Sequence, residues 1–195
     1  MVSREGLGQW SATVDTLGFF TRSVEDLEVL SEAFRIQDDT APSGQPFKIE
    51  GAKIGFCKSY YWPNAGPGTK NAFDKAKHIL QGKGATVEDV ELPADFAKVL
   101  DWHRDVLAGE GRSSFLGQAL LGKDKLDDDI LGYVENRRNV SRKAQMEAYD
   151  NCARLRPVWD ELASKYALIL TPSVVDEAPL GLEYSGDMVS SLVSV

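Results

Sequence analysis

The architecture of this chain follows from the run Lys53-Ile54-Gly55-Phe56-Cys57, whose apolar residues predict a short buried strand. Apolar residues at helical spacing then predict a helix over 70–81, with Thr69 as its cap and Gly82 as a stop signal. The run 85–92 predicts a second strand. Two strands joined through a helix form a right-handed crossover between parallel neighbours. We therefore expect an α/β protein with a mostly parallel sheet flanked by helices.

Further elements are predicted on both sides of this unit. Ser23 has the properties of an N-cap, and the helix that follows it should end near Ile36. A long helix is expected over 141–165, and Pro157 should kink or split it because proline removes one hydrogen bond and crowds the preceding turn. The apolar run 167–170 predicts another buried strand.

The domain organisation follows from length and from the positions of the loops. With 195 residues, 43% of them apolar, the chain can form one domain with a core. Its Pro, Gly and Asp content makes 37–50 an internal linker, and 173–195 is expected to be a loop-like tail. The region 94–166 is mostly helical in pattern. Its expected breaks are the glycines at 109, 111, 117, 122 and 132.

Composition excludes several classes of partner. The net charge is -8 and the isoelectric point is near 4.8, which argues against nucleic acid and anionic membranes as partners. The sequence has neither a secretory signal nor a stretch long enough to span a bilayer, so we expect a cytoplasmic protein. Cys57 and Cys152 are far apart without CxxC spacing, which predicts two reduced, buried thiols.

No catalytic, metal or cofactor site can be assembled from the residues themselves. The Gly-flanked serines in 111–117 do not have G-x-S-x-G spacing and are better explained as a helix break. His78 and His103 lack the neighbours that a zinc or iron site requires. The acidic run 127–129 fits a helix N-terminus better than a cation site.

Three segments nevertheless resemble one known family. The first comprises Ser3-Arg4-Glu5-Gly6-Leu7 and the run from Asp15-Thr16-Leu17-Gly18-Phe19 to Asp26. The second is 53–57 leading to Trp62-Pro63, and the third is 167–172 leading to Ala178-Pro179-Leu180-Gly181. Together they resemble the amidase signature enzymes, in particular the fungal-type amidases. The resemblance covers nearly the whole chain, but only the middle-to-late part of a family member, so we expect 1–195 to be a single partial domain of that fold.

The resemblance implies hydrolysis of a carboxamide C–N bond by a Ser-cis-Ser-Lys mechanism. In a typical member the lysine and both serines precede the segment that begins here, so no catalytic role is transferred to this chain. The resemblance does imply that this chain forms part of the wall of the substrate channel. The residues expected there are Asp15, Thr16, Trp62, Thr171 and Pro172, together with 178–181. The alternative is that Asp15 holds a turn and that Thr171-Pro172 merely ends a strand.

Three functional hypotheses result. The first is a segment of an amidase that is inactive as this chain alone, supplies scaffold and part of the substrate channel, and would bind a small amide if completed by the missing half. The second is a non-catalytic binding or regulatory protein built on a remnant of the fold. The third is a shortened gene model. Because the rest of the family's sheet is missing, buried strands such as 167–170 should lie at or near a sheet edge. A partial fold should also expose apolar surface, which predicts self-association.

Overall fold

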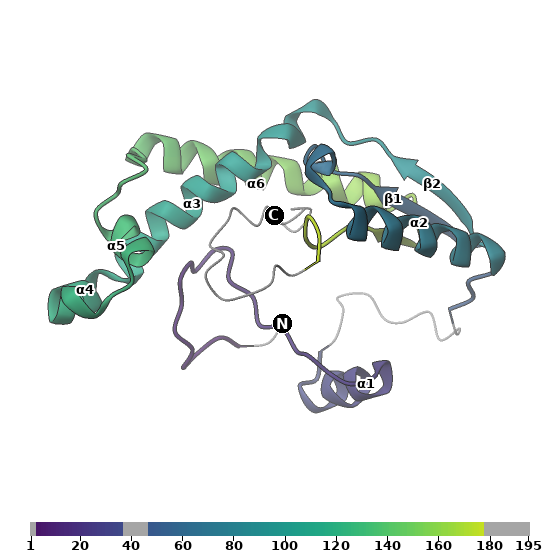
Figure 1. Ribbon diagram of the computed structural model, residues 1–195, viewed down its shortest axis with the longest axis horizontal. Coiled ribbons are helices and arrows are strands. Elements are labelled where there is room, and N and C mark those ends of the chain that lie inside the picture. The colour runs from purple at the N-terminus through teal and green to yellow at the C-terminus, as the bar shows by residue number, and fades with distance from the viewer. Residues whose placement is uncertain (1–2, 37–46, 178–195) are drawn as a thin grey trace. The chain divides into compact units, whose positions relative to one another are not determined.

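The computed structural model describes residues 3–36 and 47–177 (Figure 1). Contacts within the chain divide it into two compact units. The first contains Met1–Pro46 and Val106–Val140, and the second contains Phe47–Asp105 and Ser141–Val195. The second unit carries the sheet, and helix α3 (Val99–Ser114) runs from the second unit into the first.

The sheet of the second unit is parallel, as the sequence predicts. Strand β1 (Lys53–Cys57) pairs with β2 (Thr86–Val90) on one side and with β3 (Leu168–Leu170) on the other, in the order β2-β1-β3. Helix α2 (Pro67–Gly82) connects β1 to β2 and completes the expected crossover. Within the described sheet, β3 is an edge strand, as expected for 167–170. The expectation that this strand is buried was wrong, because Leu168 is exposed and Ile169 and Leu170 are only partly buried.

One face of the sheet is covered by α2. Ile54 and Phe56 of β1 are fully buried, and the Phe56 ring meets the Phe73 ring of α2 edge-on with centroids 4.6 Å apart. Burial of aromatic and aliphatic side chains of this size is the main force that holds a helix on a sheet. Partly buried apolar residues complete this core: Ile49, Trp62, Ala76, Leu80, Val87 and Leu170.

Helix α2 begins earlier than the sequence predicts. Its N-cap is Gly66 and Pro67 occupies the first turn, so the expectation that Thr69 is the cap was wrong. Proline suits this position because it has no N–H to leave unpaired and its φ is already helical. The helix ends at Gly82, and Gly84 then turns the chain into β2 at φ +88°, a conformation that favours glycine.

A second core lies between α3 and α6 (Arg142–Ala163). Phe96, in the short 3₁₀ helix Ala94–Lys98, packs with Val99 of α3 and Leu155 of α6. Trp102 and Trp159 pack against the same cluster. Helix α6 runs through Pro157 without a break, which corrects the expected split. Residues 153 and 157 are both exposed, so water can hydrogen-bond the carbonyl that the proline leaves free.

The first unit contains α1 (Val24–Ala33), α4 (Leu116–Gly122) and α5 (Asp128–Val134). Ser23 caps α1 by accepting a hydrogen bond from the Asp26 N–H, as expected, but the helix ends at Ala33 rather than near Ile36 because Arg35 has a φ of +50°. The acidic run does begin α5: Asp127 is its N-cap, and the Arg137 guanidinium binds Asp128 through two bonds of 2.8 and 3.0 Å.

Four of the five glycines expected to break helices lie inside them: positions 109 and 111 in α3, 117 in α4 and 132 in α5. Helix α3 continues through positions 109 and 111 and ends at Ser114. The Trp10 indole lies against this stretch, and a β-carbon at Gly111 would come within 2.8 Å of its Nε1. Trp10 also contacts the rings of Phe115 and Tyr133 edge-on. Gly111 therefore provides the space in which this aromatic cluster packs.

The two edges of the described sheet differ in chemistry. On β2, Glu88 pairs with Lys53 at 2.9 Å, and Asp89 pairs with Lys58 at 3.4 Å and with Lys77 at 3.6 Å. Strand β3 consists of three apolar residues. Large apolar side chains elsewhere are strongly exposed, above all Phe20, Leu120 and Leu121. Self-association of the chain stays a prediction.

Two of the expected loops are described only in part. Residues 37–46 of the linker lie outside the described residues, whereas Ile49 packs against the core. Of the tail, 173–177 are described and contain neither helix nor strand, whereas 178–195 lie outside the description. No described helix has an apolar stretch long enough to cross a bilayer.

We predict that Gly55→Ala destabilises the second unit. A β-carbon at Gly55 would lie 2.6 Å from Val90 Cγ2 and little more than 3 Å from Tyr166 and Ile169, in the central strand. Overpacking of this kind lowers the free energy of unfolding by about 1–3 kcal/mol. Urea unfolding followed by circular dichroism should show the lower midpoint.

Gly82→Ala is the matched control for Gly55→Ala, because a β-carbon there meets nothing within 4 Å. It should leave the urea midpoint unchanged or raise it slightly, since alanine is the better helix former. Equal midpoints for the two variants would contradict the packing around β1.

Candidate functional site

Two surface hollows lie in the second unit where parallel strands end. The carboxyl ends of parallel strands share one edge of a sheet, and ligands of α/β proteins bind outside that edge. One hollow follows β3, and the other follows β1 and β2. Both are therefore positioned by the sheet itself.

The hollow after β3, here called the Thr171 hollow, has a volume of about 280 Å³. One wall comes from the first turns of α2 and the other from the segment after β3. Its lining residues are Thr69, Ala72, Phe73, Leu170, Thr171, Pro172, Ser173 and Val174. Pro172 cannot donate a ladder hydrogen bond, which agrees with the end of β3 at Leu170. Thr171 and Pro172, both expected at a substrate wall, thus lie in one hollow.

The Thr171 hydroxyl has no hydrogen-bond partner among the described residues, although its oxygen is shielded from solvent. Leaving such a group unpaired costs about 1–3 kcal/mol, so native structures rarely do so without a reason. The Thr69 hydroxyl, which also lines the hollow, donates to the Val174 carbonyl at 3.3 Å. Thr171 is therefore the lining residue of this hollow whose side-chain oxygen is buried without a partner among the described residues.

The second hollow, here called the Trp62 hollow, has a volume of about 350 Å³ and is lined by Phe56, Lys58, Ser59, Tyr60, Trp62, Pro63, Asp89, Val90, Glu91 and Leu92. Lys58 Nζ lies 5.5 Å from the centre of the Trp62 ring and 3.4 Å from Asp89. Trp62 also packs against Phe73, with ring centroids 5.1 Å apart. Trp62 and Thr171 therefore line different hollows, and Phe73 contacts Trp62 while lining the Thr171 hollow.

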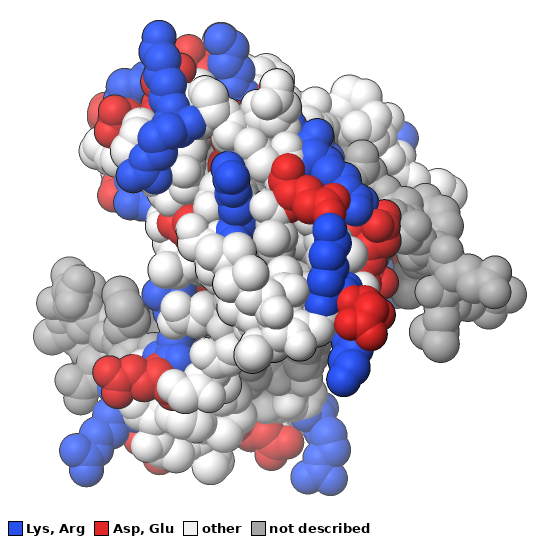
Figure 2. Space-filling model, turned by 90° about the vertical axis from the view of Figure 1, so that its left-hand side faces the viewer, with Lys and Arg blue, Asp and Glu red and all other residues white. Residues whose placement is uncertain are grey.

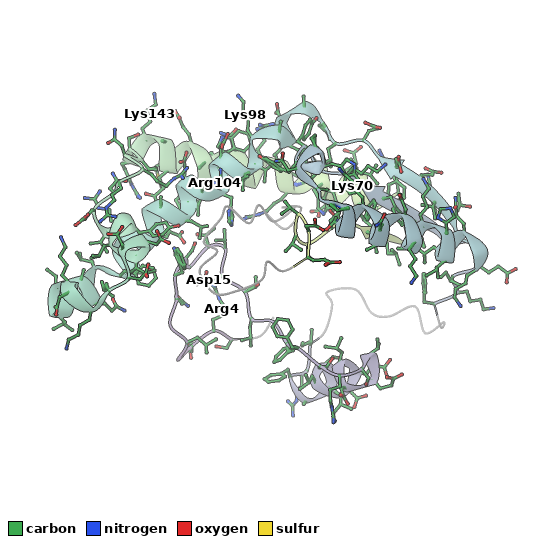
Figure 3. The ribbon with its side chains drawn as sticks, in the orientation of Figure 1. Arg4, Asp15, Lys70, Lys98, Arg104 and Lys143 are labelled. Atoms are coloured by element: carbon green, nitrogen blue, oxygen red, sulfur yellow. The ribbon has the colours of Figure 1, made fainter. Side chains whose placement is uncertain are left out.

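Asp15 belongs to the first unit, where it holds a turn. Its Oδ2 accepts hydrogen bonds from the N–H groups of Trp10 at 2.7 Å and Ser11 at 3.0 Å. Arg4 donates to the Asp15 carbonyl at 2.6 Å, and Figure 3 labels both residues on the same N-terminal segment. Thr16 is exposed beside this turn. The structure thus gives Asp15 the turn-holding role that was the alternative to a place in the substrate wall.

Glu110 of α3 is a structural residue that sequence reasoning missed. It accepts hydrogen bonds from the Ser11 hydroxyl, the Thr13 hydroxyl and, at 3.0 Å, the Thr13 N–H. Ser11 itself is fully buried. This carboxylate fixes the turn of residues 10–15 on α3, and no local sequence signal links positions so far apart.

The two cysteine thiols are poorly suited to nucleophilic chemistry. Burial raises the pKa of the Cys57 thiol to about 11, and burial also raises the pKa of Cys152. Both cysteines are unpaired and buried, as expected. Burial lowers the pKa of His103, and the Arg104 charge lowers it further. In residues 3–36 and 47–177, no group of three or more His, Cys, Asp or Glu side chains is arranged to hold a metal ion.

Charges of both signs are mixed on the face of the described residues that Figure 2 shows. Lys and Arg side chains lie there together with Asp and Glu side chains. The face therefore lacks the one-signed field that attracts a polyanion.

The parallel sheet, with hollows at the carboxyl ends of its strands, defines an α/β protein. A family model described as Amidase matches residues 1–189, so the chain belongs to the amidase signature family. The resemblance that the sequence motifs indicate is thereby confirmed.

Relatives of known name match parts of the chain. The 2-amino-5-chloromuconic acid deaminase of Comamonas testosteroni is 26% identical over 176 residues, which are 90% of this chain and 38% of that protein. A glutamyl-tRNA(Gln) amidotransferase subunit of Carboxydothermus hydrogenoformans is 32% identical over 103 residues, which are 47% of this chain and 21% of that protein. The chain thus spans well under half the length of these relatives.

A solved structure is also similar. It is the crystal structure of a bacterial aryl acylamidase of the amidase signature family, which aligns with a TM-score of 0.48 and 17% sequence identity. The alignment covers 75% of this chain and 34% of the aryl acylamidase.

We predict that both thiols of the native protein resist alkylation at pH 7.5. A thiol whose pKa is raised from 9.0 to about 11 carries roughly a hundredfold less thiolate, the reactive form, at that pH. Iodoacetamide should therefore modify Cys57 much more slowly in native than in urea-unfolded protein, as followed by peptide mass spectrometry. Equal rates in the two states would contradict the burial of Cys57.

Proposed function

We propose that the protein takes part in hydrolysis of a carboxamide C–N bond, and that this chain supplies scaffold and part of the substrate wall rather than the nucleophile. Family membership supports amide hydrolysis as the general class of reaction. The assignment of the wall rests on the Thr171 hollow, which lies at the end of a parallel strand and whose lining combines apolar residues with a threonine whose buried hydroxyl has no partner among the described residues.

The chemistry of this hollow fits a small amide with an apolar body. Phe73, Leu170 and Pro172 provide apolar contacts, whereas the Thr171 hydroxyl can both donate and accept a hydrogen bond. A carboxamide carries a donor and an acceptor side by side, so either of its polar atoms can pair with the hydroxyl. Ligand sites typically combine an apolar lining with a few placed polar groups.

The remaining candidates have weaker support. Asp15 holds a turn, and the exposed Thr16 follows it. Only the resemblance of their sequence motif supports a place for these two residues in the proposed wall. Trp62 lines its own hollow, which a larger substrate could also contact. The segment 178–181 lies outside the described residues. One relative is named as one subunit of an amidotransferase, which supports a partner chain as part of this proposal.

We expect the isolated 195-residue chain to hydrolyse no aryl amide or ester above background. The family's nucleophilic serine, bridging serine and lysine have no counterparts in the matched motifs, and the buried thiols are protonated near neutral pH. Assays with nitroanilides and with a serine-directed fluorophosphonate test this. Stoichiometric labelling of Ser113, Ser114 or any other serine would contradict the proposal.

A second prediction concerns binding at Thr171. Thr171→Val keeps the shape of the side chain but removes the hydroxyl, so benzamide should bind about fivefold more weakly, because one neutral hydrogen bond is lost. The variant should unfold at an equal or higher urea concentration, because it removes an unpaired buried hydroxyl. Chemical-shift titration of the ¹⁵N-labelled chain measures the affinity.

The matched control for Thr171→Val is Thr86→Val. It makes the same chemical change at an exposed position of β2, away from both hollows. Its benzamide affinity should equal that of the unmodified chain. Benzamide shifts centred on residues outside the Thr171 hollow would overturn the assignment of the wall.

A further inference from the structure

The first turn of α2 is bonded to a segment that lies far away in the sequence. The Gly66 N–H donates to the Val175 carbonyl at 2.7 Å, and the Thr69 N–H donates to Asp176 Oδ1 at 3.3 Å. The Thr69 hydroxyl donates to the Val174 carbonyl at 3.3 Å. Three consecutive residues after β3 thus accept hydrogen bonds from the start of one helix.

Helix α2 has no side-chain cap from its own N-cap position. Gly66 has no side chain, and the first turn contains no acidic residue. A helix N-terminus leaves N–H groups unpaired and carries partial positive charge, so a carboxylate is the most favourable partner for it. Asp176 provides that carboxylate from the segment after β3.

Two glycines make this approach possible. A β-carbon built at Gly66 would overlap the Asp176 carboxylate, and one built at Gly68 would also be too close to Asp176 and to Glu177. The Gly66-Pro67-Gly68 sequence therefore leaves a recess beside the helix start that the Asp176 side chain fills.

We propose that Asp176 is a positioning residue that holds one wall of the Thr171 hollow against α2. The relevance of this role for amide substrates rests on the function proposed above. Ser173 and Val174 line the hollow and directly precede the bonded residues, whereas Thr69 and Phe73 line it from α2. The same contacts that cap the helix thus set the distance between the two walls.

Removing Asp176 should have a wider effect than removing an ordinary helix cap. An ordinary cap affects helix stability alone. Loss of the Asp176 bond would also loosen the neighbouring bonds that the Val174 and Val175 carbonyls accept from α2, and so change the surroundings of Thr171. Two readouts without ligand report this: hydrogen exchange of the Gly66 amide, and the chemical shift of the Thr171 methyl group.

The experiment compares Asp176→Ala with Asp176→Asn in the full chain. Asp176→Ala should raise the exchange rate of the Gly66 and Thr69 amides by about fivefold, the effect of losing one cap. It should also shift the Thr171 methyl resonance and weaken benzamide binding by a similar factor. Asp176→Asn retains an acceptor oxygen and should restore most of each property.

Matched variants separate this role from general destabilisation. Gly66→Ala and Gly68→Ala should reproduce the Asp176→Ala effects, because a β-carbon would displace the carboxylate. Asp74→Ala removes an exposed carboxylate from the middle of the same helix and should change none of the readouts.

The proposal is overturned if Asp176→Ala leaves Gly66 exchange and the Thr171 methyl shift unchanged, or if Asp176→Asn fails to restore them. A different set of results would show that the proposed function is wrong. In that case the unmodified chain does not bind benzamide, while the two ligand-free readouts still respond to Asp176→Ala and support its positioning role.

Discussion

The burial of β1 between two parallel neighbours is the constraint on which the second unit depends. Ile54, Phe56 and Cys57 are almost completely inaccessible to solvent, and Gly55 lets Val90, Tyr166 and Ile169 approach the strand closely. Parallel pairing directs the carboxyl ends of all three strands to one edge of the sheet. Both hollows lie at that edge, so their location follows from the direction of the strands.

Elements that depend on local patterns are predicted well from the sequence. The change from an apolar run to helical spacing and back identifies β1, α2 and β2, and the hydroxyls of Ser23 and Ser141 mark the starts of α1 and α6. The errors arise where distant residues decide the outcome. Helix α3 continues past Gly111 where Trp10 packs against it, which no window of sequence around the glycine contains.

The residues of the candidate site also separate into those that a local motif identifies and those that depend on distant partners. Thr171 and Pro172 are named from their motif, and the structure places both in one hollow, while their role in a substrate wall stays a proposal. Glu110 and Asp176 are not found, because their partners lie about 100 positions away in the sequence. Each acts as a carboxylate that binds backbone N–H groups of a distant segment, and the sequence around each shows no corresponding signal. Asp15 illustrates the reverse case, since its motif is recognisable but its carboxylate holds a turn.

The two edge strands of the described sheet, β2 and β3, differ in how readily another strand could pair with them. Another strand could pair with β2 only beside Glu88 and Asp89, whose carboxylates are bound to lysines, and charged edge strands of this kind discourage further pairing. Strand β3 presents apolar residues and no such charges. Within the described sheet, a further β-strand would therefore meet less electrostatic resistance at β3 than at β2.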